Sequence, residues 1–343
     1  MAARGWKWLG IASGLAATAC AGAVAYGRFA TPSDLPLPAA ISGERRVVHR
    51  RSGPLSYYVT GTGAPLLLIH SINAAGSAYE VRPLAEALQA GRRVYAVDLP
   101  GFGFSDRSDR PYDIALYGAA IRDMLDEIAE EAGPGAVDAL ALSLSSEFLA
   151  RVAAEHPEAF RTLAFLTPTG FQRGAGRAGG DGRENREVPG LYGALNVPVW
   201  SRGLYSLLVT RPSIRFFLEK TWGSKEINED LFEYDYLTTH QPGAQHAPYA
   251  FVSGRLFTKN IRAVYERLAG PILVVHGTKG DFQDFSEAGW AAARPNWRFV
   301  ALDTGALPHF EKLPEVLGAY RDFLDRNAAL QASSSSPSRS PSP

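Results

Sequence analysis

The chain has 343 residues, with 35 basic and 35 acidic side chains, so its formal net charge is zero, and 46% of its residues are hydrophobic. This composition excludes a wholly disordered protein, which needs low hydrophobicity and a high net charge. It also argues against a general nucleic-acid binder, which needs a surplus of basic residues. The single cysteine, Cys20, excludes an intrachain disulfide and the paired cysteines of the usual zinc sites.

The N-terminus has the pattern of a targeting segment. Basic residues come first, and an uncharged apolar run follows over residues 9–26. We therefore predict that residues 1–30 are a signal or membrane-anchor segment. The protein would then be membrane-anchored or exported, and residues 9–26 would be the part that associates with a membrane. A retained anchor is favoured, while cleavage at Ala23-Val24-Ala25, lipidation of Cys20 and a buried helix of the domain stay open.

Two further segments have the composition of chain outside a folded core. Residues 31–42 are Pro-rich and are predicted to be a linker. Residues 331–343 are almost entirely serine and proline and are predicted to be disordered. The folded part is thus expected over residues 43–330.

Within this part, short apolar runs alternate with stretches of helical periodicity. Such alternation predicts βαβ units and a mostly parallel sheet, which is an α/β fold. The predicted strands are 47–50, 56–60, 65–70, 93–99, 136–142, 163–167, 271–276 and 297–302, and the predicted helices are 82–90, 117–131, 147–155 and 314–327.

One long segment interrupts the alternation. Residues 171–268 contain no buried-strand run and are rich in aromatic residues. The segment is far longer than an ordinary connection, which has about 4–6 residues. We predict a helical cap that is inserted into a core made of 43–170 and 269–330.

A serine follows one predicted strand and precedes a helix. Ser143 has small residues two positions away on each side, Ala141 and Ser145. A nucleophile elbow has this pattern, because a bulky residue at either position would collide with the tight turn. A polar turn in which Ser143 caps the helix is the alternative.

At this point the chain resembles the α/β-hydrolase superfamily over most of residues 41–330. His70-Ser71-Ile72-Asn73 is similar to the family's His-Gly loop, and residues 98–105 (DLPGFGFS) closely match its D-x-P-G-x-G-x-S segment. The resemblance implies an α/β-hydrolase fold with a mostly parallel central sheet, flanking helices and an inserted helical cap.

The resemblance also implies roles for individual residues. The hydroxyl of Ser143 would attack an acyl carbonyl, and the backbone N–H groups of Leu144 and Ile72 would hold the resulting oxyanion. His70 belongs to the oxyanion loop and is expected to hydrogen-bond the backbone. No cofactor and no metal is implied.

The orienting acid and the base depart from the family pattern. The usual acid position is Gly280, so Asp281 is the predicted acid and Asp284 the possible alternative. The usual catalytic histidine position is Ala306, and His309 lies three residues later. Two outcomes stay open: His309 reaches Ser143 through a rearranged loop, or the base is lost.

We therefore predict a serine hydrolase that cleaves an ester or related acyl bond of a small, apolar substrate through an acyl-enzyme. Ser143, His309 and Asp281 would form its triad. Besides the membrane contact of residues 9–26, a small-molecule substrate is the partner implied, with neither nucleic acid nor a protein partner. The alternatives are a catalytically silent binding protein of the same fold, and a carbon–carbon hydrolase or cofactor-free haloperoxidase-like enzyme that uses the same triad.

Overall fold

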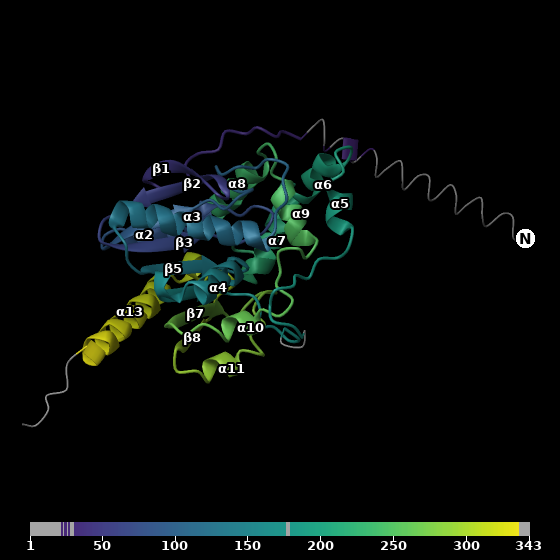
Figure 1. Ribbon diagram of the computed structural model, residues 1–343. Helices are drawn as coiled ribbons and strands as arrows, with labels where there is room; N and C mark the ends of the chain where they lie inside the picture. The colour runs from purple at the N-terminus through teal and green to yellow at the C-terminus, as the bar shows by residue number, and fades with distance from the viewer. Residues whose placement is uncertain (1–21, 23, 26, 28–30, 176–178, 336–343) are drawn as a thin grey trace, which may run out of the picture.

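The computed structural model describes residues 22, 24, 25, 27, 31–175 and 179–335 (Figure 1). Most of the predicted signal or anchor segment, and Cys20 with it, lies outside these residues. None of the helices within them is long and apolar enough to cross a membrane.

The core is an eight-stranded sheet in the order β1-β2-β4-β3-β5-β6-β7-β8. The first two strands run antiparallel to their neighbours, and all later pairs are parallel. The predicted fold class is therefore confirmed. The strands are β1 (Glu44–Arg50), β2 (Gly53–Thr60), β3 (Ala64–Ile69), β4 (Arg92–Val97), β5 (Val137–Leu142), β6 (Phe160–Leu166), β7 (Ile272–Gly277) and β8 (Trp297–Leu302).

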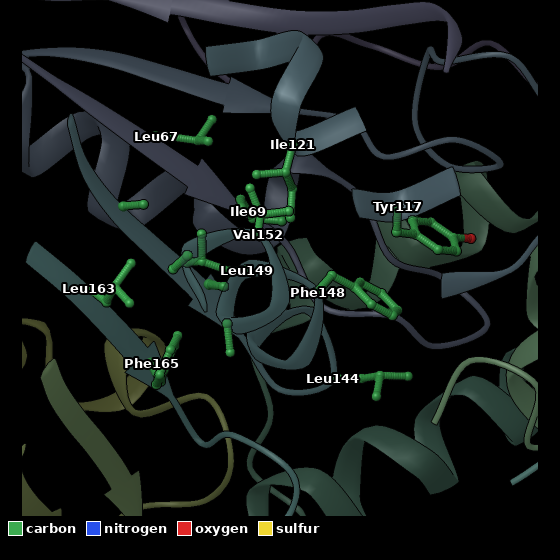
Figure 2. Close-up of a cluster of buried hydrophobic side chains, with 14 of the residues drawn as sticks. Leu67, Ile69, Tyr117, Ile121, Leu144, Phe148, Leu149, Val152, Leu163 and Phe165 are labelled. Atoms are coloured by element: carbon green, nitrogen blue, oxygen red, sulfur yellow. The ribbon is translucent and has the colours of Figure 1, made fainter. Parts of the chain in front are cut away.

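The central strands are largely apolar because both faces of the sheet are covered. On β3, Leu67 and Ile69 belong to one buried cluster, and Leu66 and Leu68 belong to the other. The first cluster packs against α3 (Ile114–Ala132) and α4 (Ser145–Glu155), as Figure 2 shows. The second packs against α2 (Arg82–Leu88) and α13 (Leu313–Ser335).

The last helix is longer than predicted. It continues to Ser335 and so enters the stretch that was predicted to be disordered from residue 331. The remaining residues of that stretch, 336–343, lie outside the described part of the chain.

The predicted cap segment is helical, and most of its helices gather at one end of the molecule (Figure 1). Asn185 and Thr258 form an isolated antiparallel bridge within it. The helices are α5 (Leu191–Leu195), α6 (Ser201–Leu208), α7 (Arg211–Trp222), α8 (Glu229–Thr239), α9 (His246–Val252) and α10 (Arg262–Tyr265). The remaining short elements are η1 (Ala78–Val81), η2 (Pro157–Ala159), α11 (Gly289–Ala292) and α12 (Pro308–Glu311).

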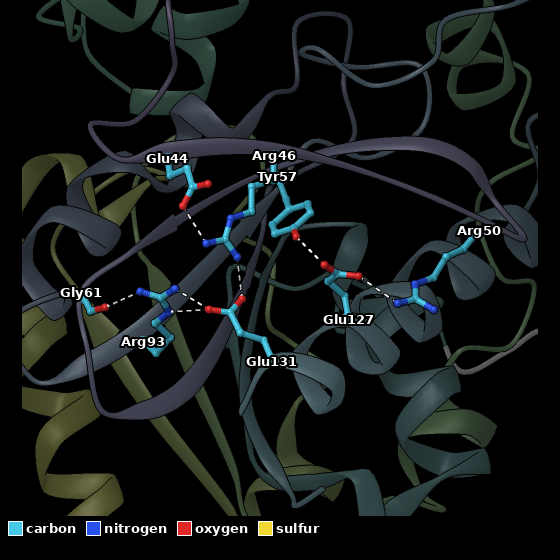
Figure 3. A network of polar contacts seen from close by, with 8 residues as sticks. All are labelled: Glu44, Arg46, Arg50, Tyr57, Gly61, Arg93, Glu127 and Glu131. Atoms are coloured by element: carbon cyan, nitrogen blue, oxygen red, sulfur yellow. Dashed lines mark hydrogen bonds and ion pairs between the residues drawn. The ribbon is translucent and has the colours of Figure 1, made fainter. Parts of the chain in front are cut away.

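Ion pairs join the antiparallel edge of the sheet to α3 (Figure 3). Arg46 and Arg93 both contact Glu131, and Arg50 contacts Glu127 with an N–O distance of 2.8 Å. These side chains are partly exposed, and such pairs contribute only about 0–1 kcal/mol each. The network therefore orients the hairpin more than it stabilises the fold.

Candidate functional site

Ser143 lies between β5 and α4, in a strained turn. Its φ angle is 50°, a left-handed conformation that costs a non-glycine residue about 1–2 kcal/mol. The neighbouring strand holds the turn, because the N–H of Ser143 donates to the carbonyl of Leu166 with an N–O distance of 2.9 Å. This is the backbone geometry of a nucleophile elbow.

The small residues on each side of the elbow are fully buried. Ala141 and Ser145 have no exposed surface. The hydroxyl of Ser145 donates to the carbonyl of His70, with an O–O distance of 2.6 Å. The serine found where glycine is usual therefore ties the elbow to the loop that follows β3.

Two buried main-chain donors are available beside these loops. Within the described part of the chain, no group accepts a hydrogen bond from the N–H of Leu144 or of Ile72. A buried N–H without a partner is rare and costs free energy. Unpaired N–H groups after an elbow serine and in the preceding loop are the donors that an oxyanion hole requires.

The loop that carries Ile72 is held by a buried carboxylate. Glu80 accepts hydrogen bonds from the N–H and the hydroxyl of Ser71 and from the amide of Asn73, at 2.7, 3.0 and 2.8 Å. Burial raises the pKa of Glu80, while these bonds favour its charged form. The cap reaches the same loop, because Tyr205 of α6 donates to the carbonyl of Ala74 at 2.8 Å.

His70 has a structural role in this loop, as the sequence predicted. Its Nε2 accepts from the N–H of Leu99 at 2.9 Å, so its Nδ1 carries the proton and donates to the carbonyl of Ser71 at 2.6 Å. Burial lowers the pKa of His70 to about 4, which keeps the ring neutral. His70 thus joins the loop after β3 to the loop after β4.

His309 makes its hydrogen bond away from Ser143. It lies in α12, fully buried, and its Nε2 donates to the backbone carbonyl of Glu80 at 2.6 Å. Its Nδ1 has no partner among the described residues. Burial lowers the pKa of His309 to about 4. Neither ring nitrogen bonds Ser143 in this arrangement.

The two predicted acids are also engaged elsewhere. Asp281 is exposed and pairs with Lys220 of α7, with an N–O distance of 3.1 Å. Asp284 accepts from the backbone N–H groups of Arg173 and Ser286. The side chain of Ser286, and next these two backbone groups, lower the pKa of Asp284 to about 2. The structure therefore does not bring the side chains of the predicted triad together.

The cap contacts both of the loops in which the family's acid and base positions lie. The C-terminal end of α7 lies on both, since the N–H of Asp281 donates to the carbonyl of Lys220 at 3.2 Å and the N–H of Ala306 donates to that of Thr221 at 2.8 Å. A Cβ at Gly280, the family's acid position, would lie 2.6 Å from the carbonyl oxygen of Lys220. The docked helix end thus occupies space that a side chain at 280 would need.

The loop after β8 is packed as closely. A Cβ at Gly305 would lie 2.4 Å from the carbonyl oxygen of Thr221 and 2.5 Å from Cα of Trp222. The ring of Trp222 in turn lies 6.0 Å from that of Phe310. The loops that carry acid and base in the family here form a docking site for α7.

A cavity of about 180 Å³ lies between α6 and the segments 32–33 and 239–245. Tyr205, His240 and Gln245 are among its lining residues, and Ser143 is not. It is therefore separate from the elbow, although Tyr205 touches both the cavity and the oxyanion loop.

The family follows from a comparison with known proteins. Residues 66–319 match the model of the Alpha/beta hydrolase family. The chain belongs to this family. As an alpha/beta hydrolase, it shares its fold with several solved structures that are less than 25% identical, so these likenesses support the fold alone.

Three of these structures illustrate the range of activities on the fold. A serine hydrolase involved in carbazole degradation has a TM-score of 0.65 and 17% identity, with 82% of this chain and 98% of that chain covered. A meta-cleavage product hydrolase from Pseudomonas fluorescens IP01 has a TM-score of 0.62 and 17% identity, with 82% and 97% covered. A membrane phospholipase A, described as a bacterial virulence factor, has a TM-score of 0.64 and 18% identity, with 94% and 96% covered.

Sequence reasoning missed the residues that support the site. Glu80 was not singled out, although a glutamate inside the apolar stretch AYEV was a weak signal of a buried carboxylate. Asp235 of α8 was missed too: it is 6% exposed, and its Oδ1 has no hydrogen-bond partner in the described part of the chain. Burial, and next the charge of Glu80, raise the pKa of Asp235 well above its usual value.

The raised pKa of Asp235 should make the stability of the folded chain depend on pH. The carboxyl is protonated in the folded chain at a pH where the unfolded chain, with an ordinary pKa of about 4, has lost the proton. The free energy of unfolding that this group contributes therefore falls as pH rises above about 4. We expect Asp235→Asn to gain stability relative to the wild type between pH 4 and neutral pH, measured by urea unfolding.

Asp230→Asn, on the exposed side of the same helix, is the control for removal of a carboxylate. A difference between Asp235→Asn and the wild type that stays constant over this pH range would contradict the prediction.

Proposed function

We propose that this alpha/beta hydrolase binds the carbonyl group of a small acyl compound at Ser143 and lacks the fast acyl-enzyme chemistry of a Ser-His-Asp triad. The combination that supports the proposal is a strained elbow with two unpaired N–H donors, next to triad loops that hold α7 instead of an acid and a base. Of the alternatives drawn from the sequence, this is nearest to the catalytically silent binding protein, but it retains slow hydrolysis assisted by the oxyanion donors.

The chemistry follows from the groups that are present. A carbonyl oxygen that sits between the N–H groups of Leu144 and Ile72 gains two main-chain hydrogen bonds, which strengthen as negative charge develops on the oxygen. The hydroxyl of Ser143 has no described base that takes its proton. Attack by Ser143 is then slow, and polarisation of the carbonyl is the main effect of the site.

The size of the rate acceleration, and of its loss on mutation, distinguishes this proposal from a triad enzyme. When a triad member is removed from a serine hydrolase, oxyanion binding alone still accelerates the reaction about 10³–10⁴-fold over water. In an intact triad, loss of the serine or of the histidine costs about 10⁶-fold in kcat. A chain without a working triad should still accelerate the reaction through its oxyanion donors. It should not lose about 10⁶-fold in kcat when Ser143 or His309 is replaced.

The test uses p-nitrophenyl butyrate, an activated ester with a short apolar acyl group. We expect saturable hydrolysis above the buffer rate, inhibited by butyrate, that falls less than about tenfold in either Ser143→Ala or His309→Gln. We also expect a fluorophosphonate probe to label the wild type no faster than Ser143→Ala.

Either of two results would overturn the proposal. Complete absence of hydrolysis above the buffer rate would remove the acyl site. A loss of about 10⁴-fold or more in both variants, with rapid probe labelling of the wild type, would establish a working triad. Circular dichroism of each variant checks that the fold is retained.

One observation favours the serine hydrolase with His309 as its base as the second candidate. The buried Nδ1 of His309 has no partner among the described residues, and a buried polar atom without a partner calls for an explanation. If His309 leaves the Glu80 carbonyl when substrate binds, it could take the proton of Ser143. The His309→Gln variant in the same assay decides between the two candidates.

A further inference from the structure

The cap has an apolar surface on two consecutive helices. Trp200, at the start of α6, is 42% exposed, and Leu207 and Leu208 near its end are 37% and 40% exposed. On α7, Phe216 and Phe217 are each 54% exposed, and their rings lie 5.4 Å apart. We call these five residues the cap apolar face.

Both helices are apolar on their buried side as well. Tyr205 and Val209 of the α6 region are buried, and so are Ile214, Leu218 and Trp222 of α7. A surface helix of a soluble protein normally has a polar outer face. Large apolar residues gathered on the outside of both helices therefore indicate contact with an apolar partner.

The N-terminal chain reaches the same helix. A Cβ at Gly203 of α6 would lie 2.1 Å from the carbonyl oxygen of Val24, and a Cβ at Gly27 would lie 2.6 Å from that of Gly203. Small residues thus let the end of the N-terminal segment approach α6 closely. Val24 belongs to the uncharged run 9–26 of the sequence, so the described end of that run lies beside α6.

We propose that the cap apolar face lies in the interfacial layer of the lipid bilayer with which residues 9–26 associate. Aromatic residues are favoured at that depth, and helices that lie on membranes bury their apolar face there. This inference does not depend on the chemistry at Ser143.

The charges beside the face indicate which lipids it accepts. Arg211 pairs with Glu233, and Arg215 pairs with Glu229, each with an N–O distance of 2.6 Å. These arginines are neutralised within the protein, so they add little attraction to anionic headgroups. Arg202 of α6, which is exposed and donates to the carbonyl of Thr31, is the remaining arginine of these two helices. Contact of the face with the bilayer should therefore be driven mainly by apolar burial and depend only weakly on salt.

Cys20 is the single cysteine of the chain, so its replacement leaves an introduced cysteine as the one site for a thiol-reactive label. In the full-length chain with Cys20→Ala, we would introduce Phe217→Cys or Leu207→Cys and attach the environment-sensitive fluorophore NBD. The matched control is Val47→Cys on β1, a residue that is 48% exposed at the edge of the sheet far from α6 (Figure 1). The proteins are reconstituted in vesicles of equal parts phosphatidylcholine and phosphatidylglycerol, with and without lipids that carry a nitroxide on the acyl chain.

We expect the labels at 207 and 217 to shift to the blue and to be quenched by the nitroxide lipids, at low and at high salt alike. The label at 47 should keep its emission in water and resist quenching. Labels at 207 and 217 that behave like the label at 47 would overturn the proposal. A blue shift without nitroxide quenching would also overturn it. The label would then lie in an apolar environment that is not lipid, which means that a second copy of the chain covers the face.

Discussion

Replacement of Gly305 by alanine is expected to lower the free energy of unfolding by about 2–3 kcal/mol, the cost of forcing atoms into a closely packed site. The added methyl would lie 2.4 Å from the carbonyl oxygen of Thr221 and 2.5 Å from Cα of Trp222. Both are backbone atoms of α7, so a change of side-chain rotamer cannot relieve the contact. The φ angle of Gly305 is not left-handed, so the loss would measure the contact with α7 alone.

The matched control is Gly318→Ala in α13. A methyl group there would meet no atom within 4 Å, and alanine within a helix is more stable than glycine by about 0.5–1 kcal/mol. Urea unfolding of the two variants should therefore give changes of opposite sign. If Gly305→Ala were as stable as the wild type, the end of α7 would not lie on the loop after β8 in solution.

Replacement of Glu80 by alanine is expected to remove most of the residual ester hydrolysis, about 10²-fold, because the loop that holds the N–H of Ile72 loses its support. The carboxylate accepts from Ser71 and Asn73, and its loss leaves buried donors unpaired at a cost of about 1–3 kcal/mol each. Since hydrolysis is attributed to the oxyanion hole, this loss should exceed that of Ser143→Ala.

Two variants sharpen this comparison. Glu80→Gln keeps one acceptor oxygen and should recover part of the rate. Glu86→Ala on α2 removes an exposed carboxylate that pairs with Arg82 and should leave the rate unchanged. Should Glu80→Ala keep the wild-type rate while its stability falls, Glu80 would support the fold alone and would not position the oxyanion hole.

The features that could be predicted from the sequence are those that depend on local pattern. The elbow around Ser143 follows from a buried strand, small flanking residues and a helix within a short stretch of chain. The alternation of strands and helices predicted the parallel sheet, and the absence of a strand run over 171–268 predicted the helical cap. The family resemblance added the loop at His70, whose hydrogen bonds are those expected.

The predicted triad depended on contacts between segments far apart in the sequence. His309 was the nearest histidine to the usual position, but its partner is a backbone carbonyl at Glu80, 229 positions away, which no side-chain pattern encodes. Asp281 was a plausible acid by spacing, but Lys220 lies on a helix whose packing direction the sequence leaves open. Gly280 and Gly305 indicated turns, while their close approach to α7 became visible only in three dimensions.

The docking of α7 on these loops has a consequence for how such a chain changes over generations. A carboxylate at 280 must first displace the backbone of Lys220, because its Cβ would lie 2.6 Å from that carbonyl oxygen. A single substitution that introduces an acid at 280 is therefore expected to lower stability before it raises any reaction rate. An acid at this position requires the end of α7 to change together with the loop after β7.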